Sequence, residues 1–180
     1  MTLPSPETTA RTTAAEPNAV KMRSIPTNLG RLAVYDTGIP SRTDASSEVL
    51  VLWPSLLADH RIYNAQVAAL RERYRLILID GPGHGASGAS TGSFSMAHCA
   101  DAVVQVLEVL EIAQPVVCIG TSWGGLVAGE FALSYPHRTR AVIMLNTPVF
   151  KSESYWSRAA RAASAQRSPP ISTDAATVFT

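Results

Sequence analysis

A short motif with glycine at both ends, Gly-Thr-Ser-Trp-Gly at residues 120–124, constrains the fold more than any other segment of the chain. An apolar run over 116–119 precedes it, and a segment of helical character follows it. A strand that turns sharply into a helix presses neighbouring turns together, so only very small side chains fit two positions before and two positions after the apex. Gly120 and Gly124 meet this requirement. The motif therefore predicts that Ser122 stands at the carboxyl edge of a sheet, where ligands bind in open α/β folds.

The rest of the chain alternates short apolar runs with longer segments of helical period, a pattern typical of strands crossed by helices. The expected strands are residues 32–35, 49–53, 76–79, 116–119 and 141–145. The last three are apolar on both faces and suit the buried middle of a parallel sheet. The expected helices are residues 59–74, 95–111 and a segment from 123 that stops before Pro136. The predicted fold class is α/β, a doubly wound, mostly parallel sheet with helices on both faces.

The two ends of the chain differ in composition from this middle part. Residues 1–27 are rich in Thr, Ala and Pro with almost no large apolar groups, so we expect a flexible tail, and translation could start at Met22 instead of Met1. Residues 28–150 hold the predicted core. Residues 151–180 begin with an amphipathic segment, in which Tyr155 and Trp156 share an apolar face, and end in a Pro- and Ser-containing tail.

Composition narrows the classes of function. The formal charge of +1 argues against a dedicated nucleic-acid binder. No apolar run is long enough to span a membrane and the N-terminus lacks an apolar signal region, so we expect a cytoplasmic protein without membrane contacts. Cys99 and Cys118 lie far apart in the sequence, which favours free thiols over a disulfide or a metal site.

Three segments in the same order resemble the α/β-hydrolase superfamily, over about residues 28–150. The first is residues 80–87, Asp-Gly-Pro-Gly-His-Gly-Ala-Ser, which are similar to the Asp-x-x-Gly-x-Gly-x-Ser turn of that family. The second is the serine motif, and the third is residues 138–146, which resemble the strand after the family's serine helix. The resemblance implies hydrolysis of a carboxylic ester or lactone by Ser122, acting on a small acyl or lactone substrate without a metal or organic cofactor.

The resemblance also implies an oxyanion hole made by two backbone N–H groups. One belongs to Trp123, directly after the serine, and the other maps to Leu56 in the loop that starts at Trp53. That loop has Pro54-Ser55 where many relatives have His-Gly, and so looks more like the Asn-Ser-Leu-Gly version of enol-lactone hydrolases. Only main-chain N–H is needed, and each such donor lowers the barrier by roughly 3 kcal/mol.

A competing interpretation concerns residues 83–88, which also fit the Gly-x-Gly-x-x-Gly pattern of dinucleotide sites. No helix is expected to open at Gly88, and the segment follows a middle strand instead of the first. We therefore expect a tight turn in which His84 is a hydrogen-bonding residue and not a catalyst.

The partners that a catalytic serine needs are not evident. A serine hydroxyl requires a base and an orienting acid, which follow it along the chain in the order acid then His in this family. After the serine the only histidine is His137, expected at the far end of the serine's helix, and Glu130 lies within that helix. Glu153 and Asp174 are not well placed, and Asn146 is not an acid. Acid and base therefore stay unassigned.

Two further histidines precede the serine. We interpret His60, near the oxyanion loop, and His98, at a helix start, as turn or surface residues. Only 58 residues follow Ser122, so residues 28–150 are expected to be the N-terminal part of a hydrolase core and 151–180 the start of a helical cap. The final strands, the acid and the base would then be missing, and the apolar surface left uncovered would favour self-association.

Other functions stay open at this stage. A degenerate hydrolase could bind a ligand or a partner without catalysis. The same fold also supports perhydrolysis and C–C bond hydrolysis, because fold does not fix reaction. Whether this chain is itself an active enzyme is left undecided by its sequence.

Overall fold

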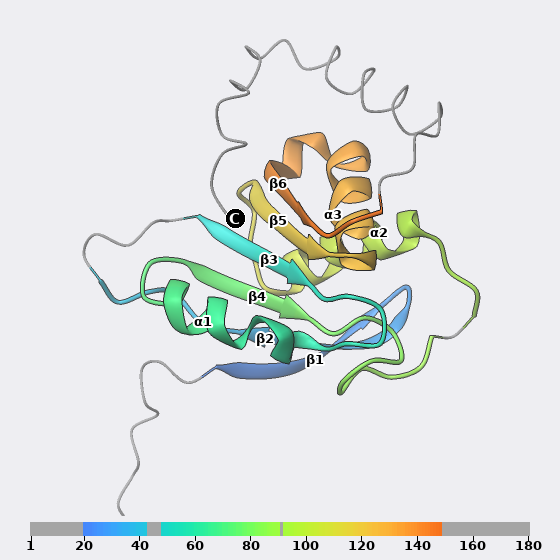
Figure 1. Ribbon diagram of the computed structural model, residues 1–180, viewed down its shortest axis with the longest axis horizontal. Coiled ribbons are helices and arrows are strands. Elements are labelled where there is room, and N and C mark those ends of the chain that lie inside the picture. The colour runs from blue at the N-terminus through green and yellow to red at the C-terminus, as the bar shows by residue number, and fades with distance from the viewer. Residues whose placement is uncertain (1–19, 43–47, 91, 149–180) are drawn as a thin grey trace, which may run out of the picture.

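A mixed sheet of six strands, in the order β1-β2-β4-β3-β5-β6, forms the centre of the molecule (Figure 1). This computed structural model describes residues 20–42, 48–90 and 92–148. The strands are β1 (Lys21–Thr27), β2 (Gly30–Asp36), β3 (Val49–Trp53), β4 (Arg75–Ile79), β5 (Val116–Thr121) and β6 (Thr139–Leu145). β1 and β2 pair antiparallel to their neighbours, and β4, β3, β5 and β6 run parallel to one another. The predicted α/β class is confirmed.

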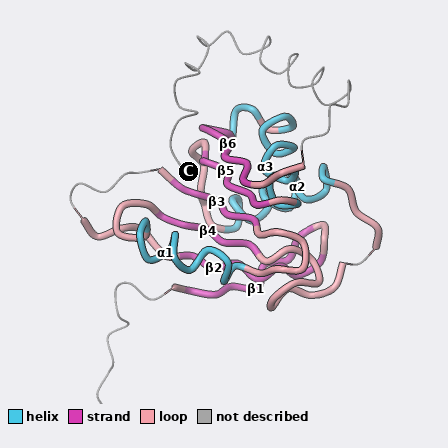
Figure 2. The backbone as a smooth tube through the Cα atoms, in the orientation of Figure 1, coloured by secondary structure: helices cyan, strands magenta, loops and turns pink. Residues whose placement is uncertain are grey.

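Helices cover both faces of this sheet (Figures 1 and 2). They are η1 (3-10, His60–Tyr63), α1 (Asn64–Leu70), α2 (Met96–Val109), α3 (Trp123–Ser134) and η2 (3-10, Pro136–Arg138). The segment predicted as one helix over 59–74 is thus a 3-10 turn followed by a short helix. Its apolar stripe nevertheless packs against the sheet, because Tyr63, Val67, Leu70 and Tyr74 all contact the same core cluster.

Two apolar cores lie on opposite faces of the sheet. Alternate residues of the central strands point to α2 and α3 or to α1: Val51 and Ile77 belong to the first cluster, and Leu52 and Leu78 to the second. All five residues of β3 are buried, which explains its uninterrupted apolar sequence. Because β3, β4 and β5 are parallel neighbours, their carboxyl ends lie at one edge of the sheet, and the loops that follow them meet there.

Two expectations about strands are wrong. Residues 21–27 are not part of a tail: they form β1, which pairs with β2 over seven residues and buries only Ile25. Because only one of its apolar residues points inward, β1 is stabilised mainly by pairing with β2. Its sequence therefore shows no alternation of apolar and polar residues that would predict a strand. The segment 141–145 is not in the middle of the described sheet, since β6 pairs only with β5 there and leaves Ile143 and Leu145 exposed. Its apolar sequence did not reveal which neighbours it has.

The remaining expectations about the chain concern its ends and its cysteines. Residues 1–19 and the amphipathic segment with Tyr155 and Trp156 lie outside the described residues. Cys99 and Cys118 are free and buried, as predicted, and burial raises the pKa of each thiol to about 12. Across the described part of the chain, no helix combines the length and hydrophobicity needed to cross a bilayer.

Candidate active site

Ser122 occupies the sharp turn between β5 and α3. Its φ of 54° and ψ of −116° lie in a region that non-glycine residues rarely adopt. Such a conformation costs about 1–3 kcal/mol and persists only when the surrounding structure enforces it. Two contacts do so: the Ser122 N–H donates to the Leu145 carbonyl at 2.8 Å, and the Ser122 carbonyl accepts from the Gly125 N–H at 3.0 Å.

The glycines of the motif are required by space. A Cβ atom at Gly120 would overlap the backbone of Gly124, and one at Gly124 would overlap the carbonyl oxygen of Trp53. Gly125 is equally crowded, because the Thr147 side chain fills the place of its missing Cβ. The turn is therefore packed tightly against both the loop after β3 and the segment after β6.

Among the backbone N–H groups at this edge that have no hydrogen-bond acceptor within the described residues are those of Trp123, the first residue of α3, and of Leu56, in the loop after β3; the N–H groups of Ser55 and Gly124 have none either. The first N–H groups of a helix lack intrahelical acceptors and attract negative charge. The N–H of the next residue, Leu57, is already engaged, since it donates to His84 Nε2 at 3.0 Å. The beginning of this loop lies against the strand-to-helix turn around Ser122, called the elbow below, where Trp53 pairs with Gly120 in the sheet.

Aromatic rings surround the Trp123 side chain. The ring centroids of Trp53, His84 and Phe94 lie 5.7, 5.8 and 6.3 Å from that of Trp123. Within the described residues the buried indole nitrogen of Trp53 has no hydrogen-bond partner, and the Trp53 and Trp123 rings meet edge to face, at 77°. Together the rings form an apolar wall beside the serine motif.

Sequence reasoning missed the residue that ties the loop after β3 to the elbow. The buried Tyr63 hydroxyl donates to the Trp53 carbonyl at 2.8 Å and lies 2.9 Å from Thr121 Oγ1. Burial raises the pKa of Tyr63, and the hydrogen bond from Thr121 only partly offsets this. An aromatic residue on an apolar helical stripe signals packing, but its polar end gives no signal in the sequence.

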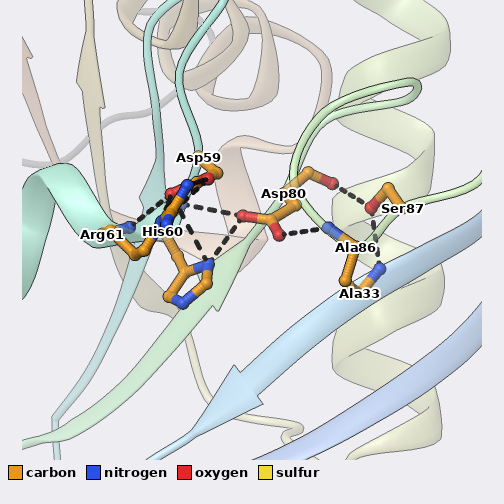
Figure 3. Close-up of polar contacts among 7 residues, drawn as sticks. All are labelled: Ala33, Asp59, His60, Arg61, Asp80, Ala86 and Ser87. Atoms are coloured by element: carbon orange, nitrogen blue, oxygen red, sulfur yellow. Dashed lines mark hydrogen bonds and ion pairs between the residues drawn. The ribbon is translucent and has the colours of Figure 1, made fainter.

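The turn after β4 is held by the fully buried Asp80 carboxylate (Figure 3). Its Oδ1 accepts from the His60 backbone N–H at 2.7 Å and lies 3.0 Å from His60 Nδ1, while its Oδ2 accepts from the Ala86 N–H at 3.1 Å. The Ser87 hydroxyl donates to the Asp80 carbonyl at 2.7 Å and accepts from the Ala33 N–H at 2.8 Å. These contacts explain why the motif at residues 80–87 begins with Asp and ends with Ser.

Asp59, His60 and Asp80 are the described side chains that could hold a metal ion, with one candidate ligand atom of each within 4.8 Å of the others. Their carboxylates already have partners. Asp59 binds the Arg61 guanidinium through both oxygens, at 2.7–3.0 Å, and this hydrogen bonding lowers the pKa of Asp59 to about 2. The cluster is thus satisfied by protein donors, and Arg61 would repel a cation.

None of the histidines in the described residues is hydrogen-bonded to Ser122. His60 pairs with Asp80 and stacks on Tyr35 at 3.6 Å, and His98 Nδ1 accepts from the Ser95 N–H at the start of α2. His84 is a hydrogen-bonding turn residue, as predicted, with Nδ1 2.9 Å from the Pro82 carbonyl.

The structure also brings no candidate base or acid from the described segment after the serine into contact with Ser122. His137 lies in η2, beyond α3, whose 12 residues span about 18 Å from the serine. Glu130 is buried within that helix and accepts from the Ser134 hydroxyl. Glu153 and Asp174 lie outside the described residues, and Asn146 follows β6 with a φ of 47°.

Comparison with known proteins places this geometry in context. Residues 48–168 match the family described as alpha/beta hydrolase fold. The chain is 31% identical over 134 residues to a 3-oxoadipate enol-lactonase 2 of Acinetobacter baylyi, which covers 74% of this chain and 50% of that protein. It is 33% identical over 96 residues to a pimeloyl-[acyl-carrier protein] methyl ester esterase of Yersinia enterocolitica, covering 53% of this chain and 35% of that one.

A solved structure, epoxide hydrolase A of Mycobacterium thermoresistibile, superposes with a TM-score of 0.64 at 28% identity, covering 81% of this chain and 45% of that chain. The chain therefore spans half or less of the length of each of these relatives.

Proposed function

The chain belongs to the α/β hydrolase fold family, and on that premise we propose that Ser122 is the nucleophile in the hydrolysis of a small carboxylic ester or lactone. One observation carries the proposal: the serine has a φ of 54° at the end of β5, at the sheet edge where the N–H groups of Trp123 and Leu56 have no acceptor among the described residues. A strained serine beside two unengaged donors suits acyl transfer better than a purely structural turn does.

The proposed reaction has two steps. Ser122 Oγ attacks the carbonyl carbon, and the Trp123 and Leu56 N–H groups bind the oxyanion that forms. The C–O bond then breaks, which releases an alcohol from an ester or opens the ring of a lactone, and leaves an acyl group on the serine. Water attacks this acyl group and frees the acid. A base must take the Ser122 proton and return it to the leaving oxygen. No residue is assigned to this role, because all four histidines lie in the described residues and none is hydrogen-bonded to Ser122.

The substrate class follows from the relatives and from the surroundings of the serine. Two of the three relatives carry names that denote cleavage of an ester bond, one in a lactone and one in a methyl ester. The third is named for epoxides, so the bond that is broken is the finer part of the proposal. The apolar rings of Trp123 and Phe94 would suit the hydrocarbon part of an acyl group.

A second candidate is a protein that binds such molecules without turnover. The position of His137 beyond the far end of α3 favours it, because the histidine that follows the serine in the described residues cannot reach the serine hydroxyl. The two candidates differ in whether Ser122 is chemically activated.

A fluorophosphonate probe, which reacts with activated serines, separates them. If Ser122 is the nucleophile, the 180-residue protein is labelled, the Ser122→Ala variant is not labelled, and the control Ser134→Ala, at the far end of α3, is labelled like the parent. Mass spectrometry of the labelled peptide identifies the residue. A parent protein that binds a short-chain ester in a titration but takes no label would overturn the nucleophile assignment and support the binding protein.

A further inference from the structure

We propose that His84 is a positioning residue that holds the loop after β3 in the orientation needed for the Leu56 N–H to act as an oxyanion donor. The inference rests on the proposed function, because it assigns a role to the same loop. It goes further in naming a side chain, and a protonation state of that side chain, on which the donor depends.

The two ring nitrogens of His84 have opposite roles. Nδ1 lies 2.9 Å from the Pro82 carbonyl, which can only accept a hydrogen bond, so Nδ1 carries the proton. Nε2 lies 3.0 Å from the Leu57 N–H, which can only donate, so Nε2 presents its lone pair. Both partners are backbone groups, and they fix His84 as a neutral imidazole with its proton on Nδ1.

Two hydrogen bonds between described residues hold this part of the loop: one from the Leu57 N–H to His84, and one from the Ala58 N–H to the Ser55 carbonyl at 3.2 Å. Leu57 has a φ of 61°, unfavourable for a leucine, and its side chain is 90% exposed, so packing does not hold the residue in place. Its N–H is anchored on His84. The Leu56 N–H belongs to the preceding peptide, so a shift of the Leu56–Leu57 peptide would reach this donor through the Leu56 Cα.

The same imidazole lies along the residue that carries the other proposed donor. Its ring centroid is 5.8 Å from that of Trp123, with the two planes inclined by 30°. One side chain therefore contacts both halves of the proposed oxyanion hole: the loop after β3 by a hydrogen bond, and the start of α3 by ring packing.

Backbone hydrogen bonds close the turn that contains His84, and the side chain adds one bond within it, from Nδ1 to the Pro82 carbonyl. The backbone bonds run from the His84 N–H to the Gly81 carbonyl and from the Ser87 N–H to the His84 carbonyl, and the Asp80 carboxylate binds the turn from within. A glycine or alanine at this position would leave those bonds intact. The hydrogen bond between Nε2 and the Leu57 N–H instead links this turn to the loop after β3.

Two variants separate the hydrogen bond from the ring. His84→Phe keeps a planar ring beside Trp123 but has no acceptor, and His84→Gln loses the ring but can present an amide oxygen close to the position of Nε2. On the full 180-residue chain we would measure the imidazole 15N shifts, the hydrogen exchange of the Leu57 amide, and the rate of labelling by the fluorophosphonate probe.

The parent should show the Nδ1-protonated tautomer. His84→Phe should exchange the Leu57 amide about fivefold faster, as expected for one lost hydrogen bond, and should label roughly tenfold more slowly. His84→Gln should stay within about twofold of the parent in both. The proposal is overturned by a proton on Nε2, by unchanged Leu57 exchange in His84→Phe, or by a His84→Gln variant that behaves like His84→Phe.

Failure of the proposed function would look different. If the parent takes no label, Ser122 is not activated, and the tautomer and the Leu57 exchange still decide whether His84 holds the loop.

Discussion

Two turns at the same edge of the sheet, the one after β4 and the one after β5, use their polar groups in opposite ways. In the turn after β4, Asp80 and Ser87 are bound on every side by backbone or side-chain partners (Figure 3). In the turn after β5, Ser122 is strained, and the Trp123 N–H has no acceptor within the described residues. Buried polar groups are normally paired, so the first arrangement is typical of a structural turn. The free N–H at the start of α3 is open to an acceptor from outside, and in the proposed function the substrate oxyanion supplies it.

The difference shows how a short glycine motif can serve two purposes. The glycines after β4 include Gly83 and Gly85, whose φ values of 74° and 52° let the chain fold around a carboxylate. Those after β5 have no such φ, and instead allow backbones to approach more closely than any side chain permits. The first set stabilises a turn, and the second allows the sharp bend that holds the half-buried Ser122.

The largest expected effect is on the packing of the elbow. Gly124→Ala would drive a methyl group into the carbonyl oxygens of Trp53 and Pro54, and should lower the free energy of unfolding by about 3 kcal/mol or more. Gly92→Ala is the matched control, because nothing lies within 4 Å of the added carbon. Urea denaturation of both variants measures the difference, and equal midpoints would mean that the elbow is not tightly packed.

The next effect concerns the closed turn. Asp80→Ala leaves the His60 and Ala86 N–H groups without their acceptor and should cost about 2–3 kcal/mol. Asp59→Asn, on the neighbouring carboxylate that binds the exposed Arg61 side chain, should have a much smaller effect, because solvent screens that ion pair. Thermal or urea unfolding compares them. If both variants lose the same stability, the network of Asp80 does not hold the turn.

A smaller, pH-dependent effect is expected at the other end of β4. Burial alone would raise the pKa of Asp36, but the bonds from the Arg75 guanidinium, at 2.6 and 3.0 Å, and from the Gly38 N–H outweigh it and lower that pKa. The pair therefore stabilises the protein above the ordinary aspartate pKa of about 4, and this stability is lost as the pH falls through the lowered value. Asp36→Asn should cost about 1.5 kcal/mol at pH 7, with the gap to the parent closing below about pH 4. A gap that does not change with pH would contradict the ion pair.

The smallest effect tests the strain of the open turn. Ser122→Gly removes the side chain that disfavours a φ of 54° and should stabilise the protein by about 0.5–1 kcal/mol. Ser122→Ala removes the same hydroxyl but keeps the Cβ atom, and should be close to neutral. Differential scanning calorimetry of the two variants isolates the backbone contribution. Equal melting temperatures would mean that the serine is not strained.

Periodicity predicted much of the fold, but it missed β1 and misplaced β6. Continuous apolar runs predicted β3, β4 and β5, because strands covered on both faces have no polar positions to interrupt them. β1 gave no such signal, since six of its seven residues are not buried and its stability comes from pairing with β2. The sequence of β6 is as apolar as that of a central strand, although β6 lies at the edge of the described sheet and its Ile143 and Leu145 side chains are exposed.

At the candidate site, the sequence by itself determined the parts that depend on local chemistry: a glycine-flanked serine between a strand and a helix, and a glycine-rich turn opened by Asp80 and closed by Ser87. These follow from steric limits on neighbouring residues, which any fold must obey. Only the tertiary structure decided which distant groups meet there. Tyr63 reaches Thr121, Leu145 receives the Ser122 N–H, and His84 holds Leu57, all across strand neighbours that are far apart in the chain. Such contacts depend on the order and register of the strands. Neither can be read from the residue types and spacings within a short segment of the sequence.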